Sequence, residues 1–174
     1  MPVADFGQPR LERLVDDMLG RGRVAGSFLF DGPAGTGKEA LAVDLGRLVN
    51  CEREGRCPPQ AAFARPKASG ERCPSCRKFL RLQHPDLHLV FPVPSGVWEG
   101  ATESIQKMLE AKAKDPYHKP EFDRPVGIQA EVLRENVVAP VQRRPFEARV
   151  KVVVVSDAEQ MAFGIGNLVL KTLE

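Results

Sequence analysis

The chain has 174 residues, a length that predicts one compact domain with room for at most a small appendage. Its 25 Lys and Arg residues nearly balance its 23 Asp and Glu residues, and 43% of its residues are hydrophobic, so the composition is that of a globular protein rather than a disordered one. The net charge of +2 does not by itself predict a nucleic-acid partner. The run Val152 to Val155, as long as any apolar run in the chain, falls far short of the roughly 20 residues of a membrane-spanning helix. The N-terminus lacks the apolar region of a secretory signal, so we expect a cytoplasmic protein, in which cysteines are more often metal ligands or free thiols than disulfides.

The first part of the chain predicts a helix, a strand, a glycine-rich loop and a second helix. Apolar residues at three- and four-residue spacing predict a helix over 11–19, ended by Gly20 and Gly22. The run 27–30, SFLF, predicts a buried strand because a glycine-rich turn follows it. The spacing in 39–48 predicts a helix. Strand, loop and helix in this order begin an α/β unit.

The second part predicts two strands and three helices. The strands are 87–91 and 150–155, and the valine-rich second one is typical of a strand buried on both faces of a parallel sheet. Residues 95–125 between them are predicted to be an insertion. The helices cover 102–112, with Ile105, Met108 and Leu109 inward, 129–138, closed by Pro140, and 165–174.

Residues 32–38, GPAGTGK, match the first seven positions of the phosphate-binding P-loop pattern between a predicted strand and helix. Glycines let backbone N–H groups point at an anion, the helix N-terminus adds a positive field, and the lysine reaches the terminal phosphates. The candidate nucleotide-binding residues are therefore Gly32, Gly35, Thr36, Gly37 and Lys38. The alternative is a glycine-rich turn that holds no ligand.

The positions that hold Mg²⁺ in hydrolysing P-loop enzymes are altered. Glu39 replaces the Ser or Thr of the eighth position, and a carboxylate there repels a triphosphate unless it takes the metal itself. Ser156 follows the valine strand directly, and the carboxylates Asp157 and Glu159 come later, where they could simply favour the start of the next helix. The sequence thus predicts a loop that can bind phosphate but hydrolyses ATP poorly or not at all, with no catalytic residue. It leaves open whether ATP and Mg²⁺ bind.

Four cysteines lie in or beside a stretch, 51–76, that is rich in Arg, Pro and Gly and has no apolar periodicity. They are Cys51, Cys57, Cys73 and Cys76, and the last two form a Cys-Pro-Ser-Cys knuckle. Four thiolates complete a tetrahedral structural zinc site with no open position. Such an ion supplies on the order of 10 kcal/mol to the folding of a polar segment. A redox Cys-x-x-Cys and an iron–sulfur cluster are the alternatives.

Basic residues in two segments could lie near DNA phosphates, although a solvated charged surface is the simpler interpretation. They are Arg77, Lys78, Arg81, Arg143, Arg144, Arg149 and Lys151.

The P-loop, the cysteines after the following helix, the segment 84–92 (HPDLHLVFP) and the segment 151–174, in this order, resemble bacterial clamp-loader subunits of the AAA+ class. Among these the delta prime type of DNA polymerase III is the most similar. The related gamma and tau types carry Ser or Thr after the P-loop lysine and an Asp-Glu pair after the strand, so Glu39 and Ser156-Asp157 favour delta prime. In that family, four cysteines in this region hold zinc.

The resemblance implies an AAA+ P-loop fold over 1–174, a parallel sheet flanked by helices, with a zinc-binding insertion at 51–76 and a further insertion at 95–125. The chain is expected to be incomplete at its C-terminus, because Glu174 falls in a predicted helix where the family continues. The implied function is that of a largely non-hydrolysing subunit of the DNA polymerase III holoenzyme that helps to load the sliding clamp onto primed DNA, with gamma or tau and delta as partners. The alternatives are an ATP-hydrolysing motor subunit of the gamma or tau type and a zinc-stabilised nucleic-acid-binding module with a vestigial P-loop.

Overall fold

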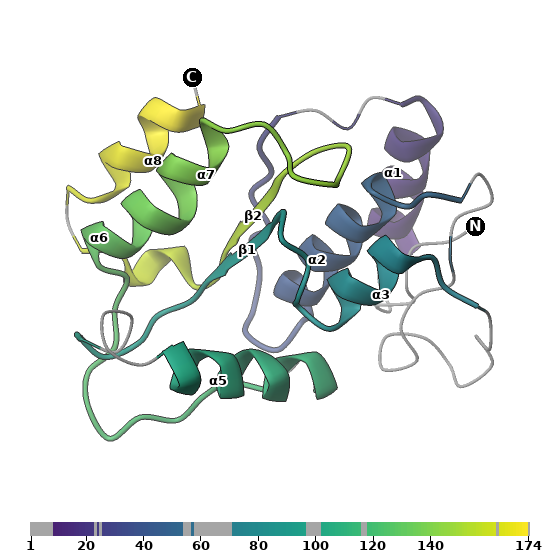
Figure 1. Ribbon diagram of the computed structural model, residues 1–174. Coiled ribbons are helices and arrows are strands. Elements are labelled where there is room, and N and C mark those ends of the chain that lie inside the picture. Colours follow the sequence, from purple (N-terminus) through teal and green to yellow (C-terminus); the bar gives the residue numbers. More distant parts are fainter. Residues whose placement is uncertain are drawn as a thin grey trace.

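A computed structural model describes residues 9–22, 24, 26–53, 57, 71–96, 102–115, 118–162 and 164–173. These residues form a small parallel sheet with helices on both of its faces (Figure 1). The elements in chain order are α1 (Pro9–Gly20), α2 (Lys38–Val49), α3 (Pro74–Leu80), β1 (Leu87–Val90), α5 (Thr102–Lys114), α6 (Ala130–Leu133), the π-helical turn η1 (Arg134–Val138), α7 (Ala139–Val141), β2 (Val152–Val155), the 3₁₀ turn η2 (Ala158–Gln160) and α8 (Gly166–Leu173). The predicted α/β class with a parallel sheet flanked by helices is confirmed at this level.

The two strands of the sheet are the two predicted in the second part of the chain. They run parallel, with Leu87 opposite Val152 and Val90 opposite Val155. Because successive side chains point to opposite faces, Leu89 and Val154 pack towards α2 and α5, whereas Val90 packs towards α6, η1 and α8. Both faces are therefore covered, as the valine-rich composition of β2 predicts.

The helix after the phosphate loop lies unusually close to the sheet. A Cβ atom added at Gly46 of α2 would come 2.8 Å from a methyl carbon of Val152, so any larger residue there would force Val152 to shift. Helix α5 covers the same face with Ile105, Met108 and Leu109, as predicted from their spacing. The predicted insertion thus contains a helix that packs into the core.

The predicted strand at 27–30 is wrong. These residues pair with no strand in the described part of the chain, and Leu29 is 89% exposed. Only Phe30 packs inward, against the cluster between α1 and α2. The run has the composition of a strand, but a strand also needs a neighbour for its backbone hydrogen bonds, and composition does not reveal one. Helix α1 itself ends at Gly20 as predicted.

The helix predicted over 129–138 extends further in the structure, to Val141. Pro140 does not close it, because the helix passes through η1 and continues to Val141. Pro140 lies in the first turn of α7, where the missing N–H of proline is tolerated. The π-helical turn before it shifts the hydrogen-bond register and so accommodates the ring.

The boundaries of the two insertions stay predictions, because residues 54–56, 58–70 and 97–101 lie outside the described residues. Within the described ranges, no helix is both long and apolar enough to span a membrane.

Candidate metal centre and phosphate loop

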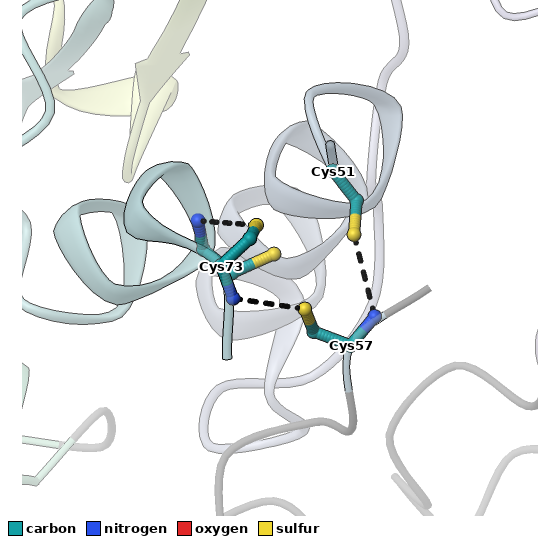
Figure 2. Close-up of side chains that lie close together, drawn as sticks. Cys51, Cys57 and Cys73 are labelled. Carbon is teal, nitrogen blue, oxygen red and sulfur yellow. Dashed lines mark hydrogen bonds between the residues drawn. The ribbon is translucent and has the colours of Figure 1, made fainter. Parts of the chain in front are cut away.

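The four candidate metal ligands come together in the structure. Cys51 follows the end of α2, Cys73 caps the N-terminus of α3, and Cys76 lies in the first turn of that helix. With Cys57, their sulfur atoms all lie within 4.8 Å of one another, and all four residues are buried. Figure 2 shows Cys51, Cys57 and Cys73 pointing towards one another from separate segments. The cluster therefore joins the end of α2 to the start of α3.

Each sulfur atom accepts a hydrogen bond from a nitrogen. The backbone N–H of Cys57 donates to Cys51 Sγ at 3.3 Å, that of Cys73 to Cys57 Sγ at 3.2 Å, and that of Cys76 to Cys73 Sγ at 3.4 Å (Figure 2). The fourth bond runs from the Arg47 guanidinium to Cys76 Sγ at 3.6 Å. Donors aimed at sulfur favour the thiolate, which is the form that binds metal.

A buried ion pair in α2 supports the cluster from inside the protein. Arg47 donates from Nε to Asp44 Oδ1 at 2.6 Å, and both side chains are fully buried. The guanidinium also donates to the backbone carbonyl of Cys57 at 3.1 Å. The pair therefore fixes Cys57 through its backbone and Cys76 through its sulfur, as outer hydrogen-bond partners of a metal site do.

Without a cation the cluster does not ionise readily. Burial raises the pKa of the Cys76 thiol far above its ordinary value, despite the opposing effect of Arg47. Burial also raises the pKa of Cys57. For Cys73, burial acts in the same direction and is the largest single effect, but several hydrogen bonds, the strongest from the backbone N–H of Cys76, together outweigh it and the pKa is lowered. Four buried sulfurs thus need a positive ion at their centre to carry negative charge together.

The donor set fits a single zinc ion. Tetrahedral coordination at about 2.3 Å places sulfur atoms about 3.8 Å apart, within the 4.8 Å spread of this cluster. Because all four sulfurs are buried and would be used as ligands, no position would remain for substrate, so an ion held there would be structural. One ion fits this compact arrangement better than a cluster of several iron atoms would.

The phosphate loop precedes α2 and is largely exposed. Gly32, Gly35 and Gly37 have φ angles of 146°, 78° and 80°, the left-handed backbone that the pattern requires of glycine. The Lys38 ammonium turns back to the carbonyl oxygens of Gly32 and Pro33, at 2.6 and 2.7 Å. The loop is thereby closed on its own lysine, which a phosphate would have to draw away from these carbonyls.

Glu39, at the altered eighth position of the loop pattern, is hydrogen-bonded to residues from two other parts of the chain. Glu39 Oε1 accepts from the Lys112 ammonium of α5 at 2.7 Å, and Glu39 Oε2 accepts from the Ser156 hydroxyl at the end of β2. Asp157 turns to Lys119, with 3.3 Å between the ammonium and the nearer carboxylate oxygen. Asp157 makes no side-chain capping bond to η2, so its carboxylate is not a helix cap.

Two of the seven basic residues, both lysines, are bound to other groups of the protein. The Lys78 ammonium lies 2.6 Å from the Glu147 carboxylate, and Lys151 donates to three backbone carbonyls of the 140–144 turn. The five arginines of the set are all exposed: Arg77, Arg81, Arg143, Arg144 and Arg149.

A serine and a histidine that the sequence does not link lie next to the cysteines. Ser75 Oγ is 3.4 Å from His84 Nε2, but this hydroxyl donates to the Asn50 carbonyl and both residues are buried. His84 Nδ1 accepts from the backbone N–H of Asp86, so the proton lies on Nε2 and the ring cannot take one from the serine. The contact is structural, and burial lowers the pKa of His84.

Sequence reasoning missed the charged residues that hold both sites together. The Asp44 and Arg47 pair is visible as an i, i+3 spacing on the apolar face of a helix, which is a usable signal. Lys112 gives no such signal, because its partner Glu39 is 73 residues away in the sequence.

The comparisons with known proteins identify the family of the chain. A family model described as "DNA polymerase III, delta subunit" matches residues 7–174, so the chain belongs to this family. The DNA polymerase III subunit delta' of Bacillus subtilis (strain 168) is 26% identical over 170 residues. The similarity is thus to a delta-prime-type subunit. The match covers 96% of this chain but 38% of that relative, so the chain spans less than half of the relative's length. No solved structure matches the chain at a significant level.

Proposed function

We propose that this chain is the AAA+ P-loop part of a delta-prime-type clamp-loader subunit, which helps to load the sliding clamp onto primed DNA and does not hydrolyse ATP itself. The family match over residues 7–174 supports a role in DNA replication. The expected partners are gamma or tau and delta, and the expected place of action is the cytoplasm.

The bond between Ser156 and Glu39 carries the non-hydrolysing part of the proposal. Hydrolysing P-loop enzymes need a hydroxyl at the eighth loop position and a carboxylate after the strand, both directed at Mg²⁺. Here the carboxylate is on the loop and the hydroxyl follows the strand, and they bond to each other. Neither group is left to organise a metal ion and an attacking water.

ATP turnover tests this proposal. We expect a clamp loader reconstituted with the Lys38→Ala form of this subunit to hydrolyse ATP as fast as the wild-type complex, because the loop takes no part in hydrolysis. The same lysine change in gamma or tau is the positive control and should lower turnover. ATP turnover by this protein alone that disappears in Lys38→Ala would establish the motor-subunit alternative instead.

The second element of the proposal is a structural zinc ion bound by Cys51, Cys57, Cys73 and Cys76. It joins α2 to α3 through a segment with little apolar content, so its removal should unfold that segment. Metal analysis of the purified protein should give about one zinc per chain, as a closed site of four thiolates requires. A folded protein without metal, or one that contains iron, would contradict the proposal of a structural zinc ion.

A further inference from the structure

A buried lysine, Lys112, places a positive charge next to the phosphate loop. Lys112 of α5 is 5% exposed, and its ammonium lies 2.7 Å from Glu39 and 5.5 Å from the centre of the Phe91 ring. A buried lysine is rare and requires compensation of its charge. Glu39 supplies that charge from the first turn of α2, and the aromatic face adds a cation–π contact.

The position of this ammonium is fixed by packing. Helix α5 buries Ile105 and packs Met108 and Leu109 against the face of the sheet that α2 also covers. Lys112 follows one turn later on the same helix, so its reach to Glu39 is set by the core. The packing of α5 therefore places the ammonium at the loop, and no cation has to be taken up from solution to neutralise Glu39.

A divalent ion does not fit this arrangement. Mg²⁺ requires oxygen ligands in near-octahedral geometry at about 2.0–2.1 Å. Glu39 has both oxygens engaged, one by Lys112 and the other by Ser156. The remaining nearby carboxylate, Asp157, pairs with Lys119, another lysine of the insertion. An added ion would have to break these bonds and lie next to a buried positive charge.

We propose that the ammonium group of Lys112 replaces the divalent metal ion of the phosphate loop, so that this site takes no Mg²⁺ and helix α5 supplies the positive charge in its place. This inference goes beyond the proposed role in the clamp loader. It gives the insertion a chemical purpose, because two of its lysines neutralise the carboxylates beside the loop.

Binding of Mn²⁺, a spectroscopic substitute for Mg²⁺, tests the inference on the zinc-loaded protein. Electron paramagnetic resonance of free Mn²⁺ measures the bound fraction, with and without ADP. We expect no bound Mn²⁺ that depends on Glu39, so wild type and Glu39→Gln should give the same titration. In Lys112→Met we expect a gain of about one bound Mn²⁺ per chain, because a free carboxylate and hydroxyl are then available as hard oxygen ligands.

Lys114→Met is the matched control, because it removes an equal charge from an exposed position of the same helix. It should bind no more Mn²⁺ than wild type. A wild-type Mn²⁺ site that Glu39→Gln abolishes would overturn the inference, and this result does not depend on whether Lys112→Met folds. A folded Lys112→Met protein without a new site would overturn it as well. No partner subunit is needed, so a failure here is distinguishable from a failure to assemble a clamp loader.

Discussion

The guanidinium group of Arg47 lies 3.6 Å from the sulfur atom of Cys76, and both side chains are fully buried. The same guanidinium is paired with Asp44 at 2.6 Å. A core helix thus places a positive group against the cluster that we propose binds zinc. Metal binding and the packing of α2 are consequently linked through one side chain.

Replacing Arg47 should weaken both zinc binding and the stability of the fold. In Arg47→Met we expect zinc affinity to fall about 10–100-fold, because an outer hydrogen bond to a ligand is lost. We expect the free energy of unfolding to fall by about 3–5 kcal/mol, because Asp44 is left buried without its partner. Chelator competition measures the first effect and urea unfolding the second.

Two further variants separate these effects. Arg53→Met removes a partly exposed arginine near the same segment and should cost about 1 kcal/mol or less. Asp44→Leu combined with Arg47→Met should recover much of the stability but not the zinc affinity. Undiminished zinc affinity in Arg47→Met would show that the contact with Cys76 does not support the metal site.

The contact between α2 and β2 gives a second prediction. Gly46→Ala should lower the free energy of unfolding by about 1–2 kcal/mol, because overpacking costs about 1–3 kcal/mol and alanine returns up to about 1 kcal/mol of helix propensity. Thermal or urea unfolding measures the change. Gly20→Ala is the control, because nothing lies within 4 Å of a Cβ atom there. A Gly46→Ala protein as stable as wild type would mean that Val152 moves aside freely.

Hydrophobic periodicity was sufficient to predict most of the helices and both strands of the sheet. It found the packed faces of α2 and α5, where apolar residues recur at the spacing of a helix turn. It failed at 27–30, where aromatic composition gave no information on whether a neighbouring strand exists. It also ended a helix at Pro140, because a π-helical turn that accommodates proline leaves no signature in a single sequence.

The candidate sites were predictable to the extent that their residues are close in sequence. The spacing of the cysteines suggested one cluster, and the glycine pattern indicated a candidate phosphate loop. The partners that define the chemistry of each site come from distant segments. Lys112 reaches Glu39 only through the packing of α5, and Asp86 meets its backbone donors 60 and more residues later in the chain.

Asp86 provides a prediction on pH. This buried carboxylate accepts hydrogen bonds from the backbone N–H groups of Phe146, Glu147 and Ala148 at 2.6–2.9 Å. Burial alone would raise the pKa of the Asp86 carboxyl, but the three donors outweigh it and lower the pKa. A lowered pKa in the folded state means that this group stabilises the fold above its ordinary pKa of about 3.9 and that the contribution is lost as the pH falls through the folded value.

Asp86→Asn should therefore lower the free energy of unfolding by about 1–3 kcal/mol near neutral pH, because the amide leaves backbone donors without an acceptor. The difference from wild type should stay constant down to about pH 5 and shrink below about pH 4. Urea unfolding at several pH values measures it, with exposed Asp17→Asn as the control. A difference that grows in acid would contradict the assignment.

Membership of a clamp loader is the central claim, and co-purification tests it most directly. The full-length protein, tagged and isolated from its own cells under gentle conditions, should bring down gamma or tau and delta in fixed proportions that persist through size-exclusion chromatography. Nuclease treatment should leave this complex intact, because the proposed contacts are between proteins. A protein that elutes alone, or that is held to other components only through nucleic acid, would contradict the account.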